Sequence, residues 1–126
     1  MKFLHILETA YRGTIEEQDD TVVWTVHAMK NAGQDGAVLL RGNIVCHATR
    51  GQDASGLVFG EHKQSNPVDL AGDLGKLINA GVPVFVVSED AAERGLSAGD
   101  IVDDVQQVER ANVASLCDDH DMVWHW

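Results

Sequence analysis

Basic residues are scarce in this sequence. Its 126 residues include 9 Lys and Arg against 20 Asp and Glu, which gives a formal net charge of −11 at pH 7. Nucleic acids and anionic membrane surfaces repel such a chain, and no run of Lys or Arg forms a local basic patch. We therefore expect neither nucleic acid nor membrane as a partner.

Cysteine is also rare, because the chain has two, Cys46 and Cys117. Two isolated cysteines exclude a disulfide framework. The six histidines form no His-x-x-x-His pair and the cysteines form no Cys-x-x-Cys pair, so the sequence predicts no metal site. A Walker loop and a dinucleotide fingerprint are both missing, and we expect no cofactor.

Long apolar runs are missing as well. The N-terminal run "FLHIL" is shorter and more interrupted than a signal peptide requires. No stretch reaches the ~18 apolar residues of a membrane span. These features predict a cytoplasmic protein.

What the sequence does contain is an alternation of apolar strands and capped helices. Asp19, Asp20 and Thr21 are candidate caps for a helix that stops at Gly33, and Asp69 caps a second helix that stops at Gly81. Residues 41–50 are either a strand extension or a loop, and 52–67 form a loop with the apolar piece "GLVFG". The predicted strands lie near residues 2–7, 37–40, 82–88, 105–108 and 122–126, with a further helix near 110–121. This order predicts a single domain over 1–126, a three-layer α/β/α sandwich with a mainly parallel five-stranded sheet.

Polar side chains follow three of these strands. Because parallel strands end at the same edge of a sheet, we expect these residues to gather there and to form a binding site. The candidates are Glu8, Tyr11, Arg12, Arg41, Asn43, Cys46, His47, Ser88, Glu89 and Arg94.

Cys46 beside His47 suggests a thiolate next to its base. However, neighbours in an extended segment point to opposite faces, so adjacency alone does not make a catalytic pair. A small half-buried cysteine explains Cys46 equally simply. Cys117 lies on the apolar stripe of a predicted helix, which favours a core position.

The order and spacing of several segments resemble those of the DsrE/DsrF/TusD family. They are "AMKNAG", "VLLRGNIV", "LINAGVPVFVVSEDAAERGL" and the closing "DMVWHW", which together span nearly the whole chain. The resemblance implies a compact α/β sandwich with a parallel sheet, and assembly as a homotrimer or a hexamer. It also implies a role in intracellular sulfur metabolism, with sulfur-relay proteins as partners.

Sulfur-relay members of that family carry a persulfide on a cysteine eight residues before the glycine of Arg-Gly. Counting back from Gly95 reaches Val87, so the usual sulfur position holds a valine here. Three hypotheses follow. The chain is a non-catalytic binding or partner subunit, the interpretation we favour; or a sulfur carrier that uses Cys46; or an acid/base enzyme that uses Glu89, Tyr11 and His47.

Overall fold

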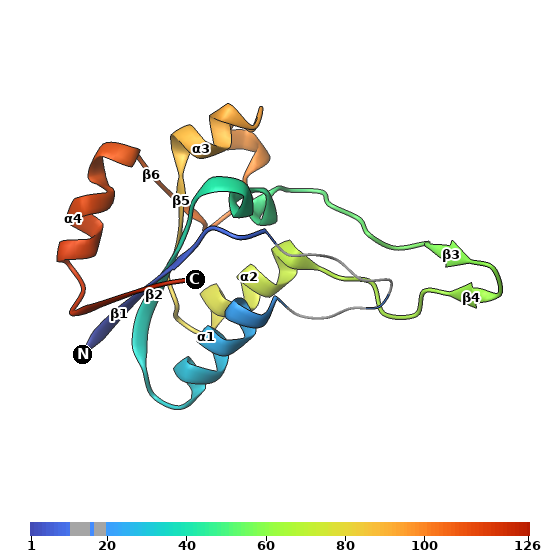
Figure 1. Cartoon of the computed structure of the whole chain (residues 1–126), viewed down its shortest axis with the longest axis horizontal. Helices are drawn as coiled ribbons and strands as arrows, with labels where there is room; N and C mark the ends of the chain where they lie inside the picture. The colour runs from blue at the N-terminus through green and yellow to red at the C-terminus, as the bar shows by residue number, and fades with distance from the viewer. Residues whose placement is uncertain (11–15, 17–19) are drawn as a thin grey trace.

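The computed structural model describes residues 1–10, 16 and 20–126, and it confirms the three-layer α/β/α architecture (Figure 1). The main sheet has five strands in the order β6-β5-β2-β1-β7. Every neighbouring pair in this sheet is parallel. The strands are β1 (Lys2–Leu7), β2 (Asp35–Leu40), β5 (Val84–Val87), β6 (Gln106–Val108) and β7 (Met122–His125).

Helices cover both faces of the main sheet. On one face, α1 (Thr21–Asn31) and α2 (Leu70–Asn79) pack on a core that includes the apolar side chains of β2 and β5. On the other face, α4 (Val113–Asp118) packs Leu116 and Cys117 against Leu4, Ile6 and their neighbours. The short α3 (Ser88–Glu93) follows β5 directly. The apolar strands are buried between these layers, as a central parallel sheet requires.

The two predicted helix caps are present. Asp20 Oδ1 accepts hydrogen bonds from the N–H groups of Val22 and Val23 at 3.0 and 3.1 Å. Asp69 Oδ1 accepts one from the Gly72 N–H at 2.9 Å. Each cap satisfies donors that the first helical turn leaves unpaired. Asp19, the other candidate, lies outside the described residues.

Two segments differ from the sequence interpretation. Residues 42–48 form a 3₁₀ helix, η1 (Gly42–Ala48), where a strand extension or a loop was expected. Gly42 has a φ of 63°, which ends β2 and turns the chain into η1. The piece "GLVFG" belongs to a small antiparallel hairpin of β3 (Val58–Phe59) and β4 (His62–Lys63).

This hairpin, residues 57–64, is called the arm below. In Figure 1 it lies at the far end of the long axis, away from the main sheet. Leu57, Val58 and Phe59 on it are 44%, 57% and 55% exposed. The Glu16 carboxylate accepts hydrogen bonds from the backbone N–H groups of Ser65 and Asn66 just beyond the arm. Glu16 Oε1 also lies 2.9 Å from His62 Nε2 on β4, so Glu16 anchors the arm while its β3 side exposes apolar side chains.

An aromatic cluster lies against β1 and β7. His5 is fully buried; its Nε2 lies 3.1 Å from Gln34 Oε1, and its Nδ1 lies 3.4 Å from Trp126 Nε1. An indole N–H only donates, so Nδ1 is the acceptor and Nε2 carries the proton. Trp124 packs edge-on against the His5 ring at 5.6 Å. Trp124 thus belongs to the cluster, while Trp126 is 42% exposed.

Asp20 also contacts His47, with 3.5 Å between Oδ2 and the imidazole Nε2. Burial raises the pKa of Asp20, but His47 and the two capped N–H groups outweigh burial and hold this pKa below its ordinary value. The folded-state pKa is therefore lower than the unfolded one. The stability from this carboxylate is present above about pH 4 and is lost as the pH falls through the folded pKa.

We expect Asp20→Ala to lower the free energy of unfolding at pH 7 by about 1–2 kcal/mol, because it removes the N-cap. Asp20→Asn keeps a capping oxygen but loses the charge. It should lie closer to the parent at pH 7 and show a weaker loss of stability toward pH 3. Urea denaturation at several pH values measures both effects. Equal acid sensitivity of the parent and Asp20→Asn would contradict the assignment.

Candidate functional site

The carboxyl ends of β1, β2 and β5 meet at one edge of the sheet, as the sequence predicted for parallel strands. A pocket of about 370 Å³ lies there and is called the strand-end pocket. Its lining comes from four separate segments of the chain. The lining residues are Glu8, Arg41, Gly42, Val87, Asp90, Arg110 and Val113.

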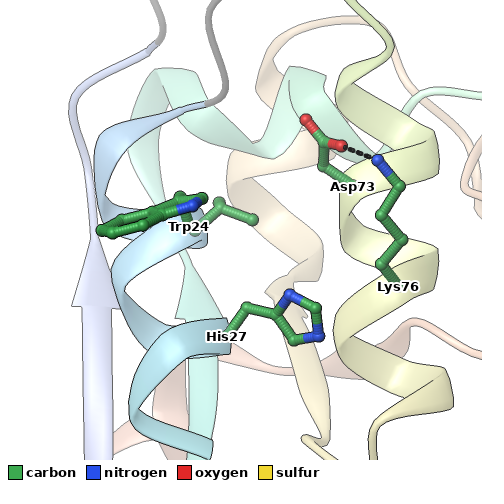
Figure 2. A pocket seen from close by; sticks show the side chains of 5 residues that line it. Trp24, His27, Asp73 and Lys76 are labelled. Carbon is green, nitrogen blue, oxygen red and sulfur yellow. Dashed lines mark hydrogen bonds and ion pairs between the residues drawn. The ribbon is translucent and has the colours of Figure 1, made fainter. Parts of the chain in front are cut away.

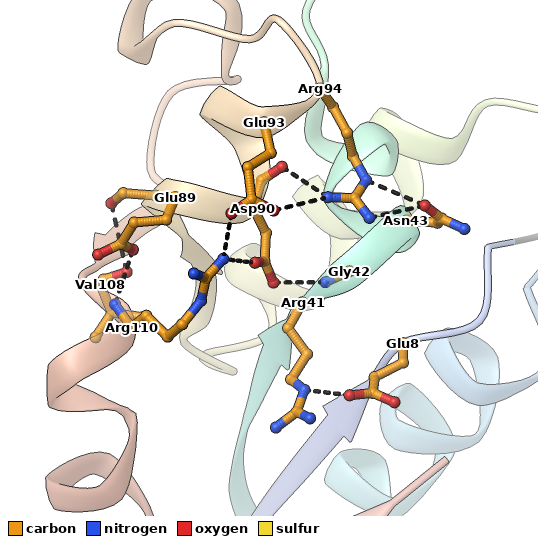
Figure 3. A network of polar contacts seen from close by, with 11 residues as sticks. Glu8, Arg41, Gly42, Asn43, Glu89, Asp90, Glu93, Arg94, Val108 and Arg110 are labelled. Carbon is orange, nitrogen blue, oxygen red and sulfur yellow. Dashed lines mark hydrogen bonds and ion pairs between the residues drawn. The ribbon is translucent and has the colours of Figure 1, made fainter.

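Asp90 on α3 is the central acceptor of this region (Figure 3). Its Oδ2 accepts a hydrogen bond from the Gly42 N–H at 2.7 Å, and its Oδ1 pairs with the Arg110 guanidinium. Burial raises the pKa of Asp90, but the Gly42 N–H and Arg110 together hold it below its ordinary value. Asp90 is therefore a carboxylate at neutral pH, and it ties α3 to the start of η1.

Arg110 begins the short 3₁₀ helix η3 (Arg110–Asn112), which leads into α4. Its Nη2 donates to Asp90 and also to Glu93 Oε1 at 2.9 Å. Hydrogen bonds to these two carboxylates raise the pKa of Arg110 further above its ordinary value. Its backbone N–H donates to Glu89 Oε2 at 2.8 Å. Arg110 thus fixes the segment before α4 to α3.

Glu8 forms the opposite side of the pocket. Its Oε1 pairs with Arg41 Nε, and its Oε2 lies 3.1 Å from His125 Nε2 at the end of β7. One carboxylate therefore joins the ends of β1, β2 and β7. Among the pocket-lining residues, the cations Arg41 and Arg110 balance the anions Glu8 and Asp90.

Two further candidates from the sequence pair with each other. The Arg94 guanidinium donates from Nε and Nη2 to Asn43 Oδ1 at 3.1 and 2.8 Å, and from Nη1 to the Asp90 carbonyl at 3.0 Å. Ser88 Oγ lies 3.4 Å from the Val108 carbonyl oxygen. Arg94 with Asn43 joins α3 to η1, and Ser88 contacts β6. None of these three side chains lines the strand-end pocket.

The structure separates Cys46 from His47. Cys46 is exposed on η1 and is absent from the pocket lining, whereas His47 is 3% exposed and faces Asp20. The two neighbours thus lie in different surroundings. Tyr11 and Arg12, the remaining candidates, lie outside the described residues.

Sequence reasoning missed Asp90, Arg110 and His125. Asp90 stands between two candidates that were chosen, so its place after β5 was an available signal. Arg110 precedes a helix and His125 lies within the last strand, and neither carries a local signal. The strand order places β6 beside β5 and β7 beside β1, which brings Arg110 to the pocket and His125 to Glu8.

A second cavity, of about 240 Å³, lies between α1 and α2. In Figure 2, His27 projects from α1 toward α2, and Asp73 and Lys76 project from α2 toward the same space. Lys76 Nζ donates to Asp73 Oδ1 at 2.8 Å. In the described part of the chain, no group of three or more His, Cys, Asp or Glu side chains is placed to hold a metal ion.

Comparison with solved structures shows the fold. The crystal structure of the ychN protein from E. coli is similar with a TM-score of 0.75 at 18% identity, over 99% of this chain and 98% of that chain. MTH1491 from Methanobacterium thermoautotrophicum, described as a protein of unknown function, gives 0.61 at 14% identity, over 99% and 97%. The DsrE-like fold implied by the sequence resemblance is therefore the fold of this chain. No protein-family model and no curated protein matches it.

Among the described residues, no helix is long and apolar enough to cross a membrane.

We expect the pair Asp90–Arg110 to couple more strongly than the pair Arg50–Asp103 in double-mutant cycles to alanine. The arginines are similarly exposed, but the Asp90 side chain is 14% exposed and that of Asp103 is 85% exposed. Water screens the second pair more effectively. Urea denaturation of the single and double variants measures both couplings. Equal couplings would show that Asp90 does not organise the site.

Proposed function

We propose that this chain is a cytoplasmic DsrE-like protein of sulfur metabolism that binds a small ligand or partner and does not carry sulfur. The observation that carries the proposal is Val87. It lines the strand-end pocket and is 2% exposed, at the position where the resemblance would place a persulfide cysteine. A valine side chain has no group that bonds to sulfur, yet a pocket is present around it.

The pocket has the character of a binding site. Its base is apolar, with Val87 and Val113, and its rim carries the Arg41–Glu8 and Arg110–Asp90 pairs. Ligand pockets typically combine an apolar lining with a few fixed polar groups. The volume of about 370 Å³ suits a small molecule.

A second candidate function is sulfur transfer through Cys46. The observation that favours it is the exposed thiol on η1, which solvent and donors reach. A Cys46 thiolate would attack the outer sulfur of a donor persulfide, so that a new S–S bond forms on Cys46, the S–S bond of the donor breaks and the donor leaves as its thiolate. The acid/base hypothesis has less support, because His47 is buried against Asp20 and Glu89 accepts the Arg110 N–H.

Intact-mass measurement after incubation with a persulfide donor separates the two candidates. A binding protein should show no added sulfur on the parent chain. A carrier should gain one sulfur on the parent and on Cys117→Ser, and none on Cys46→Ser. An adduct that depends on Cys46 and passes to an acceptor protein would overturn the proposed function.

We also propose that the protein assembles with copies of itself as a homotrimer or a hexamer. The support comes from two exposed apolar surfaces, the arm and the strand β7. On β7, Met122 and Val123 are 41% and 42% exposed, and β7 is an edge strand of the sheet. A lone two-stranded hairpin is marginally stable in water, so the arm gains most from a neighbouring copy.

Light scattering at micromolar concentration should give a trimer or hexamer mass. We expect Phe59→Asp on the arm to reduce that mass, because it places a charge in an apolar contact. Trp24→Asp is the matched control, since Trp24 is an exposed aromatic on α1, 58% exposed. A parent protein with the mass of one chain would contradict the assembly.

A further inference from the structure

We propose that the strand-end pocket binds a small monocarboxylic acid, and that the free end of the Arg41 guanidinium holds its carboxylate. This inference rests on the proposed binding function and adds the chemical class of the ligand.

One contact orients the Arg41 guanidinium, and two of its nitrogens have no contact among the described residues. Its Nε pairs with Glu8 Oε1, and its side chain is 40% exposed. Within the described residues, Nη1 and Nη2 of Arg41 have no hydrogen-bond partner, and Figure 3 shows the contact to Glu8 coming from Nε alone. Two parallel N–H donors match the two oxygens of a carboxylate.

The other cation of the pocket is more fully engaged than Arg41, because the Arg110 guanidinium pairs with two carboxylates and that of Arg41 pairs with one. Each oxygen of Asp90 already has a donor, from Gly42 or from Arg110. Arg110 Nη2 serves both Asp90 and Glu93. The free edge of Arg41 is therefore the donor pair best placed to receive a ligand.

The apolar side chains that line the pocket favour an apolar group on the ligand. Val87 at the end of β5 and Val113 at the start of α4 both line the pocket. A small aliphatic or aromatic group lying on these side chains gains from leaving water. An acid such as butyrate or benzoate combines this apolar body with one carboxylate.

Charge limits the ligand to one negative group. Glu8 and Asp90 line the pocket along with the two arginines, and the whole chain carries −11. A phosphate dianion meets these carboxylates as well as Arg41, so it binds at a greater electrostatic cost. A neutral amide has no charge for the guanidinium to attract.

The test is titration of the full chain with four probes: butyrate, benzoate, inorganic phosphate and benzamide. Ligand-observed NMR or calorimetry reports the affinity. We expect both acids to bind, and phosphate and benzamide to bind about tenfold more weakly or not at all.

Variants of the pair Arg41–Glu8 should change benzoate affinity in opposite directions. Arg41→Gln removes the charge and the donor pair and should weaken binding by about tenfold or more. Arg41→Lys keeps the charge without the planar fork and should fall between Arg41→Gln and the parent. Glu8→Gln removes a neighbouring negative charge and should strengthen binding roughly threefold. Lys63→Gln, an equal loss of positive charge on the arm, should have no effect.

The outcomes distinguish this inference from the proposed function. If phosphate or benzamide binds as well as benzoate, or if Arg41→Gln binds like the parent, the ligand class is wrong while a binding function stands. If no probe binds and Cys46 gains no sulfur, the ligand class is again wrong. If no probe binds and Cys46 carries sulfur to an acceptor, the proposed function fails as well.

Discussion

The parallel pairing of β1, β2 and β5 is the constraint on which the rest of the structure depends. β1 and β2 pair in a register that sets Leu7 opposite Leu40, so the residues that follow, Glu8 and Arg41, leave the sheet side by side. Their ion pair follows from that register. The Arg41 N–H also donates to the Leu7 carbonyl at 3.0 Å, which holds the two strand ends together at this edge.

Asp90 holds the segments at this edge of the sheet in fixed positions. Its carboxylate accepts the backbone N–H of Gly42 just after β2 and the guanidinium of Arg110 just before α4. Three segments far apart in the sequence are held by one side chain. Because the side chain is mostly shielded from water, these hydrogen bonds are stronger than those of exposed pairs. The contacts of Glu8 with Arg41 and His125 on the other side of the pocket are more exposed to water.

Local patterns predicted most of the fold. The apolar runs became the five strands, and Asp20 and Asp69 cap their helices, because burial and capping act over a few neighbouring residues. Strand order was not predictable, since it depends on contacts between distant segments. Of the residues that line the strand-end pocket, Glu8 and Arg41 were predicted from the strand ends. Arg110 and His125 were missed because their positions depend on where β6 and β7 lie in the sheet, which the sequence did not predict. The 3₁₀ helix η1 was missed because one glycine decides whether β2 continues.

The strand order also has a consequence for how the protein is made. β1 lies between β2 and β7, so Phe3 on β1 pairs with Met122, which is synthesised much later. During translation, one edge of β1 has no neighbouring strand until residues 122–125 have left the ribosome. The aromatic cluster of His5, Trp124 and Trp126 also forms only at that stage. Contacts of such long sequence separation form slowly, so the unfinished chain presents an open apolar edge of the kind that chaperones shield.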